Sequence, residues 1–327
     1  STTGNMNLIE TGDGHTHTLT SSTITNWFLN GGTIGSSSHG HIADNIIVGA
    51  GKWDVLSNPA SATPIVNVTS ATGAELDGNS HTIPLSGDFN MAGGLIGKSA
   101  LDFDASGEYY VDCGTDASLD IVNAITLEAW VKLDGSELYP RIISKQYTSD
   151  TSTGNCCYQF GVRENKLRFA LGGLFDIFTE GPDIVDNKWH HVVGTYDKVN
   201  TRLYLDGKKI YDSTANTAAI RVNAATNMTL GASEITGASP NPDYFMEGIM
   251  GRASVWNVAL TQDEIRTSMF QNYTDVSKTG LVAWYQFDEG TGVDVADSTT
   301  TNDGTYNGAW AGAGTLNWTS MPSSNPT

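Results

Sequence analysis

Cysteine is scarce in this chain of 327 residues, which contains only Cys113, Cys156 and Cys157. An odd number of cysteines cannot form a complete disulfide framework. Because Cys156 and Cys157 are neighbours, the sequence leaves open a vicinal bridge, a single bond from one of them to Cys113, or no disulfide at all. Hydrophobic residues make up 39% of the chain, which is enough for a packed core and excludes a chain that is disordered throughout.

Basic residues are also few. Lys and Arg number 17 against 36 Asp and Glu, which gives a formal net charge of −19 at pH 7. A nucleic-acid groove needs clustered Lys and Arg to replace the counterions of the phosphates, so we expect no nucleic-acid partner. No uninterrupted apolar run is long enough to cross a bilayer, so we expect no membrane insertion either.

The composition of the chain changes near residue 95, and a chain of this length predicts about two domains. The first residue is Ser1, without a Met or a signal-peptide pattern, which favours a mature or trimmed N-terminus. Residues 1–94 are rich in Ser, Thr, Gly and Asn, and Lys52 is their only basic residue. We expect a small β-rich region that anchors or oligomerises the protein, with strands at HTLTSSTI, NIIVGAG, TPIVNVTS and HTIPLSGDF.

Strand signals become stronger from residue 95 onward. In ITLEAWVKLD every second residue from Ile125 to Val131 is apolar, which predicts a strand with one face in the core. DGKK predicts a tight hairpin turn, and Thr261 with Glu264 forms the capping-box pattern of one short helix, LTQDEIRTSMF. Further strands, at the spacing typical of a sandwich or barrel, are expected at LYPRIISKQ, CYQFGVREN, KLRFALGG, WHHVVGTYD, TRLYLDGKK and NMTLGASE.

Four motifs follow one another between about residue 94 and residue 275: KSALDFDASGEYYVDCG, ITLEAWVK, NKWHHVVGTYDKVNTRLYLDGKKI and FMEGIMGRASVWNVALTQDEI. In this order they resemble the opening strand pair, the signature strand, the diagnostic hairpin and the closing strand and helix of the laminin-G-like domain of bacterial and phage proteins. The resemblance implies an all-β fold, a two-sheet antiparallel jelly-roll sandwich of the concanavalin-A-like superfamily, here over residues 95–327.

The segment GLVAWYQFDEGTGVDVADSTTTNDGTYNGAW, residues 280–310, resembles a further element of the family. In relatives this strand and acidic loop occur both at the start of a domain and after its end. Residues 280–318 therefore either add an edge strand and an acidic loop to the same sandwich or open a further module. Their position after the helix favours the first interpretation.

Two adjacent histidines in the hairpin motif, His190 and His191, raise the question of catalysis. Neighbouring residues of a strand face opposite sides, so these two cannot act together on one substrate. A general base would also need a partner carboxylate within about 3 Å, which the sequence cannot place. We therefore interpret the hairpin as structural.

Glycosidases of this fold carry closely spaced carboxylates on one strand, about 5 Å apart. Asp102 and Asp104 share a face but have no third acid at strand spacing, and the neighbours Asp288 and Glu289 face apart. The sequence thus predicts that the protein is not an enzyme. A glycoside hydrolase or polysaccharide lyase with an unrecognised site is kept as an alternative.

Many relatives hold a structural calcium ion, and the resemblance implies one here. Ca²⁺ takes six to eight oxygen ligands, and the candidates in the acidic loop are Asp288, Asp297 and Asp303. The alternative is a solvated acidic loop. The chain departs from its relatives in the closing strand, where they often have Ile-Asp-Glu and this chain has Gly251 and Arg252 in GIMGRAS.

Two His-x-His pairs occur in the N-terminal region, His15 with His17 and His39 with His41. At strand spacing each pair faces one way, which suits shared coordination of a transition metal. GHTHT also resembles stretches of phage tail fibres, in which trimers place such pairs around an axis and bind iron. The alternative is that these histidines are exposed in polar loops.

Sugar binding is the activity that the resemblance implies most directly, through aromatic rings that stack on sugar faces. Exposed aromatic residues are ordinary on protein surfaces, and no spacing selects a row of them. The candidates on loops are Tyr139, Tyr147, Phe175, Phe178 and Tyr244.

We expect a non-enzymatic structural or adhesive protein, extracellular and on a virion or cell surface, with a cell-surface glycan as ligand. On this hypothesis residues 1–94 form a homo-oligomer or larger assembly. The phrases LVAWYQFDEGTG and GAWAGAGT resemble marine phage structural proteins. The alternative is a carbohydrate-binding module of a secreted polysaccharide-degrading system, which would stay monomeric.

Overall fold

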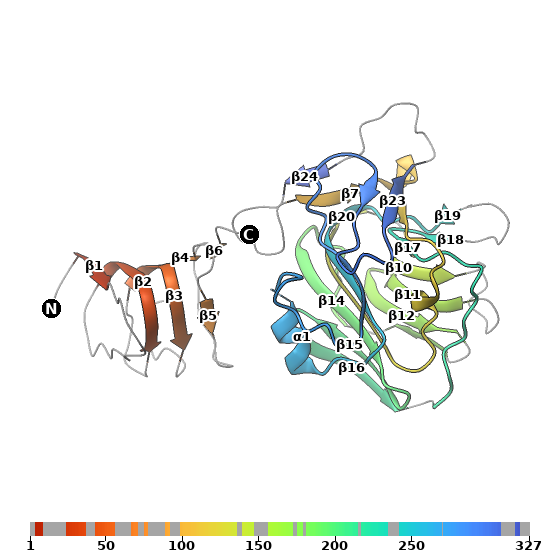
Figure 1. The fold of residues 1–327 in the computed structure, drawn as a ribbon, viewed down its shortest axis with the longest axis horizontal. Helices are drawn as coiled ribbons and strands as arrows, with labels where there is room; N and C mark the ends of the chain where they lie inside the picture. Colours follow the sequence, from red (N-terminus) through yellow and green to blue (C-terminus); the bar gives the residue numbers. More distant parts are fainter. Residues whose placement is uncertain are drawn as a thin grey trace. The chain divides into compact units, whose positions relative to one another are not determined.

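The chain divides into two compact units, Ser1–Leu95 with Pro322–Thr327, and Ile96–Met321 (Figure 1). No helix within the described ranges is long and apolar enough to span a membrane. The computed structural model describes residues 4–8, 24–36, 43–55, 67–70, 75–77, 89–91, 99–135, 139–146, 156–172, 175–178, 181–214, 217–234, 242–269, 271–308 and 318–320.

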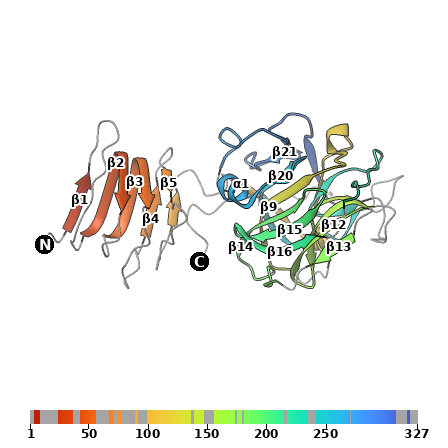
Figure 2. The ribbon, with the colours of Figure 1, turned by 90° about the horizontal axis from the view of Figure 1, so that it is seen from below.

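The first unit contains a six-stranded sheet in which every pair of strands is parallel (Figure 2). Each strand on the main path pairs with the one before it, and β5 pairs with β3. Of the segments expected to form strands, 17–23 and 81–88 lie outside the described residues. The strands are β1 (Gly4–Leu8), β2 (Ile24–Ser36), β3 (Ala43–Val55), β4 (Asn67–Ser70), β5 (Glu75–Asp77) and β6 (Phe89–Met91).

The register of this parallel sheet lines up similar residues from strand to strand. One row joins four asparagines, and the next joins five apolar residues. Successive members of one row are roughly 20 residues apart in the chain, which is the spacing of a repeat architecture. The asparagine row is Asn5, Asn26, Asn45 and Asn67, and the apolar row is Met6, Trp27, Ile46, Val68 and Phe89.

The second unit is a sandwich of two antiparallel sheets, as the resemblance implies. The first sheet has eight strands in the order β13-β12-β11-β10-β17-β8-β23-β22. Its strands are β8 (Tyr110–Asp112), β10 (Arg141–Gln146), β11 (Cys156–Arg163), β12 (Lys166–Leu171), β13 (Phe175–Phe178), β17 (Thr229–Leu230), β22 (Asp294–Val295) and β23 (Gly304–Asn307).

The second sheet has the order β16-β15-β14-β9-β20-β7-β24, and β21 pairs with β20 beyond the end of β7. A separate two-stranded ribbon joins β18 (Ser233–Glu234) to β19 (Pro242–Asp243). The strands of the second sheet are β7 (Ser99–Phe103), β9 (Ile125–Leu133), β14 (Trp189–Tyr196), β15 (Asn200–Leu205), β16 (Lys208–Thr214), β20 (Gly248–Trp256), β21 (Leu281–Tyr285) and β24 (Trp318–Ser320).

The main core lies between the two sheets, where the alternation of β9 places Ile125, Leu127 and Val131. The predicted turn in DGKK is present, with positive φ at both Asp206 and Gly207, as this type of hairpin requires. The segment after residue 280 joins the same sandwich, because β21 pairs with β20 and β23 pairs with β8.

A smaller apolar cluster covers the outer face of the second sheet, which is the face turned away from the first sheet. Trp256 and Trp284 meet there edge to face, with ring centroids 6.5 Å apart. Helix α1 (Gln262–Ser268) packs over them through Ile265. The predicted capping box is present, since Thr261 and Glu264 exchange their hydrogen bonds.

Candidate functional site

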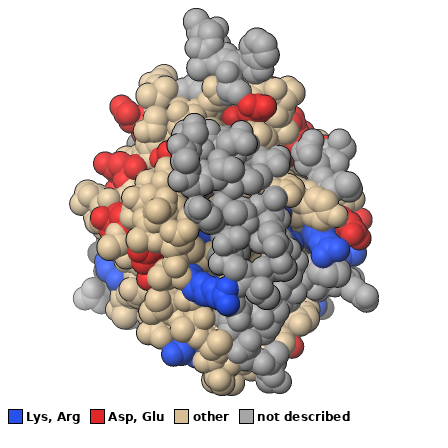
Figure 3. Space-filling model, turned by 90° about the vertical axis from the view of Figure 1, so that its right-hand side faces the viewer, with Lys and Arg blue, Asp and Glu red and all other residues tan. Residues whose placement is uncertain are grey.

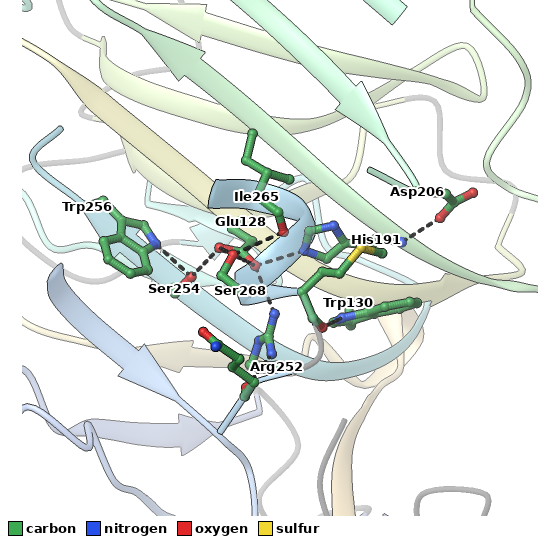
Figure 4. Close-up of polar contacts among 11 residues, drawn as sticks. Glu128, Trp130, His191, Asp206, Arg252, Ser254, Trp256, Ile265 and Ser268 are labelled. Atoms are coloured by element: carbon green, nitrogen blue, oxygen red, sulfur yellow. Dashed lines mark hydrogen bonds and ion pairs between the residues drawn. The ribbon is translucent and has the colours of Figure 1, made fainter. Parts of the chain in front are cut away.

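A buried charged network lies on the outer face of the second sheet, and we call it the Glu128 network: Glu128, His191, Arg252, Ser254 and Ser268 (Figure 4). Glu128 Oε1 lies 2.8 Å from His191 Nε2 and 2.8 Å from Arg252 Nη2. Ser254 donates to Oε2 at 3.2 Å, and Ser268 of α1 donates to Oε1 at 3.3 Å. The network therefore ties three strands of the sheet to the helix above them.

A β-bulge at Gly251 brings Arg252 to this network. Met250 pairs with Val131 of β9 and Arg252 pairs with Trp130, so Gly251 has no residue opposite. An extra residue reverses the alternation of faces, and Met250 consequently lies in the main core while Arg252 lies on the outer face. Gly251 and Arg252 thus act together, because the bulge at the first residue places the second on the outer face.

Burial and hydrogen bonding set the charges in the network. Burial alone would raise the pKa of Glu128, but the hydrogen bond from His191 and the charge of Arg252 outweigh it and hold the pKa at about 2. Burial lowers the pKa of His191 more than Glu128 raises it. The imidazole is therefore neutral at pH 7, with the Nε2 proton donated to the carboxylate. The ion pair is Glu128 with Arg252, and His191 is a neutral donor.

A histidine beside a carboxylate is the pairing that a general base requires, but no substrate can reach this one. The side chains of Glu128 and His191 are both 0% exposed. His190 lies on the opposite face, where its two nitrogens are 3.0 Å from Asp206 and 3.2 Å from Asp186. As the alternation of the strand predicts, the two imidazoles do not meet.

A pocket of about 580 Å³ opens on the same face, between α1 and the turn that follows it. Its floor is apolar, and its mouth carries carboxylates, hydroxyls and one amide. The lining residues are Trp256, Val258, Ala259, Leu260, Asp263, Glu264, Thr267, Ser268, Gln271, Asp275, Val276, Ser277 and Thr279. Sequence reasoning missed this pocket, because its lining residues look like an ordinary helix and turn.

Two of the five aromatic candidates, Tyr139 and Tyr244, lie in contact with each other, away from the pocket beside α1. The rings of Tyr139 and Tyr244 meet edge to face, with centroids 6.3 Å apart and an angle of 89°. The Arg141 guanidinium lies 4.7 Å from the centroid of Tyr244, and that of Arg163 lies 5.9 Å from Tyr139. We call these four residues the tyrosine–arginine surface.

The structure does not describe the side chains of the other three aromatic candidates. Tyr147 lies outside the described residues, and Phe175 and Phe178 lie on β13, where the backbone alone is described.

Charged residues on the described surface are unevenly distributed. On the face seen in Figure 3, carboxylates lie mainly along the upper and left margins, with others at the right margin beside Lys and Arg side chains.

The acidic loop is organised around Asp297, which is 2% exposed. Its carboxylate accepts hydrogen bonds from the backbone nitrogens of Trp284, Thr299 and Asn302 at 2.8–3.0 Å. These donors occupy the lone pairs that a cation would need, so the surroundings of Asp297 do not fit Ca²⁺. Asp303 accepts from the nitrogen of Asp297 at 2.8 Å.

Asp288, the third calcium candidate, does not join the other two in a ligand set. Among the residues that the structure describes, no three His, Cys, Asp or Glu side chains lie close enough to hold a metal ion. Calcium binding by the protein stays a prediction. The histidine candidates His15, His17, His39 and His41 all lie outside the described residues.

A further group of carboxylates gathers where three neighbouring strands end. Burial, followed by repulsion from Asp134 and Asp104, raises the pKa of Asp102. Burial and the same carboxylates also raise the pKa of Glu247. The sequence pattern DFD indicated Asp102 and Asp104. Asp134 follows β9 and Glu247 precedes β20, so only the register of β7, β9 and β20 brings these two acids to the same place.

The cysteines form none of the bridges that the sequence left open. Cys113 and Cys157 are both free thiols, and both are buried. Each alternative bridge would use one of these two residues. The second unit is therefore held by its packed core and its hydrogen bonds.

Comparison with known proteins identifies the sandwich. Residues 105–266 match the family described as the concanavalin A-like lectin/glucanases superfamily. A rat protein named for its sushi, von Willebrand factor type A, EGF and pentraxin domains is 26% identical over 195 residues, which cover 58% of this chain. This chain spans only 5% of that protein's length.

Two solved structures are similar to this chain, and the first of them, with a TM-score above 0.5, shows the same fold. A Bacteroides ovatus protein described as carbohydrate binding matches with a TM-score of 0.54 and 20% identity, over 70% of this chain and 61% of its own. Domains LG4-5 of the mouse laminin alpha1 chain match with a TM-score of 0.36 and 15% identity, over 52% of this chain and 45% of their own. Residues 105–266 therefore match the concanavalin A-like lectin/glucanase superfamily, and the second unit has the fold of a laminin-G-like jelly roll.

Proposed function

We propose that the jelly roll binds a glycan without cleaving it, through the tyrosine–arginine surface. The observation that carries the proposal is the meeting of Tyr139 and Tyr244, which are about one hundred residues apart in the chain and lie ring to ring at 6.3 Å. Aromatic faces bind the apolar face of a sugar, and the Arg163 guanidinium, whose side chain is 33% exposed, can donate to its oxygens. The Bacteroides ovatus protein, described as carbohydrate binding, has the same fold, which supports this class of ligand.

The geometry of the surface favours binding over catalysis. Tyr139 is 36% exposed, so a ring face is open to a ligand. Arg141 is almost fully buried and donates to the Tyr139 carbonyl at 2.5 Å, which holds the backbone of Tyr139 in place. A surface that is rigid before binding loses little conformational entropy when a ligand arrives.

A glycan array followed by calorimetry tests the proposal. The protein should bind a defined set of glycans, and the double change Tyr139→Ala with Tyr244→Ala should weaken binding about ten-fold or more, because both rings are removed. The matched control is Tyr139→Phe with Tyr244→Phe, which keeps the rings and should stay within about three-fold of the wild type.

Two outcomes would contradict this function. If the alanine variant bound as tightly as the wild type, the tyrosine–arginine surface would not be the site. If incubation with polysaccharides released reducing ends or unsaturated sugars, the protein would be a hydrolase or lyase. In that case the carboxylates around Asp102 and Glu247 would be the first residues to replace.

We further infer that the protein is a structural or adhesive component of a virion or cell surface, outside the cell, and that its first unit anchors or oligomerises it. The parallel sheet supports this inference, because its path ends in β1 and β6, and end strands offer backbone groups for pairing with another copy. Electron microscopy of the native source should find the chain within an assembly. A free secreted chain would favour a carbohydrate-binding module of a polysaccharide-degrading system.

A further inference from the structure

The pocket beside α1 is a concave site that shares no residue with the tyrosine–arginine surface. Its volume of about 580 Å³ is within the range of about 300–1,000 Å³ of small-molecule sites. Its floor includes Trp256, Leu260 and Val276, which belong to the apolar cluster of the outer face. Such a floor fits a flat or compact apolar group.

The mouth of the pocket is negatively charged. Asp263, Glu264 and Asp275 contribute carboxylates, and none of the lining residues is Lys or Arg. Of the two nearest cations in the sequence, Arg266 donates from Nε to the Gly207 carbonyl at 2.9 Å and has its Nη1 3.9 Å from Asp263. Lys278 donates to the Val276 carbonyl at 2.7 Å, and among the described residues neither cation forms an ion pair with Asp275. The mouth therefore favours a cation and disfavours an anion.

The Glu128 network fixes the walls of this pocket. Trp256 donates from Nε1 to Ser254 at 3.1 Å, and Ser254 in turn donates to Glu128. Ser268, another lining residue, also donates to Glu128, and Arg252 donates to the carbonyl of Gln271 at 2.9 Å. Floor, helix and turn are thus held by one buried group, which gives the pocket a fixed shape before any ligand arrives.

From the apolar floor, the acidic mouth and the fixed walls, we propose that this pocket binds a small organic cation, an amine with an apolar body. The apolar body lies on the floor, and the ammonium group lies at the mouth against Asp275. This site takes a ligand class different from the glycan of the first proposal, so the two proposals stand or fall separately.

Three probes of nearly equal size separate charge from apolar contact: benzylamine, benzyl alcohol and benzoate. Calorimetry on the full chain at low salt should rank benzylamine tightest, at about millimolar affinity for so small a ligand, and benzoate weakest. Methyl NMR should show shifts at Leu260 and Val276 on addition of benzylamine. Equal affinities for the three probes, no binding, or shifts confined to other methyl groups would overturn the proposal.

A pair of charge-matched variants locates the effect. Asp275→Asn should weaken benzylamine binding about five-fold, which is the range of one partly exposed ion pair, and leave benzyl alcohol unchanged. Asp294→Asn makes the same change in net charge on an exposed residue of β22 that does not line the pocket, and should leave both affinities unchanged. Equal losses in the two variants would assign the preference to the overall charge of the protein and overturn the proposal.

Discussion

At the residue scale, the most consequential feature of the sandwich is a charge that has no access to water. Glu128 is ionised and fully buried, and Arg252 is its only fully charged partner among the residues that the structure describes. Removing one member of a buried ion pair leaves the other without compensation, which costs far more than the loss of a surface pair.

Replacing Arg252 should therefore destabilise the protein strongly. Arg252→Met keeps much of the side-chain volume but leaves Glu128 without its ion-pair partner, and urea unfolding should show a loss of about 3–5 kcal/mol. The matched control is Arg202→Met, whose partners Asp197 and Asp212 are partly exposed, with an expected loss of about 1 kcal/mol or less.

A second change distinguishes the orphaned charge from lost packing. Adding Glu128→Gln to Arg252→Met removes the uncompensated carboxylate and should restore part of the lost stability. If the double variant were less stable than Arg252→Met alone, the network would stabilise the protein through packing and not through charge.

The adjacent histidines should respond to pH in opposite directions. Burial lowers the pKa of His191, so the stability it contributes is complete above its unfolded pKa of about 6.5 and is lost as the pH falls. The hydrogen bond to Asp206 outweighs burial and raises the pKa of His190, so its contribution is complete below about 6.5 and is lost as the pH rises through the higher folded value.

Urea unfolding of His191→Gln and His190→Gln between about pH 5 and about pH 8.5 measures these contributions as differences from the wild type. The advantage of the wild type over His191→Gln should shrink on acidification, and its advantage over His190→Gln should grow. Parallel pH profiles for the two variants would contradict the assigned protonation states.

Some of these residue roles could be predicted from the sequence and others could not. Strand alternation correctly separated His190 from His191. It could not show that the face of β9 carrying Glu128 is buried, because that depends on α1 and on β21, which are far away in the chain. The signal that was available was Arg252 itself, a cation within the otherwise apolar and small-residue strand GIMGRASVW.

At the scale of elements, α1 depends on its first turn. Thr261 accepts from the Glu264 nitrogen at 3.3 Å, and Glu264 Oε2 accepts from the Thr261 nitrogen at 2.7 Å. A helix of 7 residues is too short to be stable by propensity alone. Its capping box and its packing on the sheet must therefore hold it.

Thr261→Ala should lower the free energy of unfolding by about 0.5–2 kcal/mol, because it removes the cap. Thr267→Ala deletes the same atoms from an exposed position of the same helix, and its effect should stay within about 0.5 kcal/mol. Urea denaturation of both variants checks the difference. Equal effects would mean that the cap contributes nothing beyond an ordinary surface threonine.

Elements of the sandwich were largely predictable because each carries its own periodicity, turn or cap. The parallel pairing of the first unit was not predicted. Four of its six strands have five residues or fewer, and their relation appears only when Asn26, Asn45 and Asn67 are compared across roughly 20 residues. A search for internal repeats was the step that could have found it.

At the scale of the whole molecule, the net charge of −19 bears on assembly, since copies of so acidic a chain repel one another. If the first unit oligomerises the protein, light scattering at moderate salt should give a multiple of 34.8 kDa, and lowering the salt should shift the mass toward the monomer because screening weakens. A mass of one chain at every salt concentration would contradict the assembly hypothesis.

The in-line asparagine row has a consequence for how such chains diversify. Each strand of that sheet occupies about 4.8 Å along the direction of its hydrogen bonds. Duplication or loss of one stretch of roughly 20 residues would lengthen or shorten the sheet by one such step without altering any strand of the jelly roll. We therefore expect homologous chains to vary in the number of strands in this sheet while the jelly roll keeps its size.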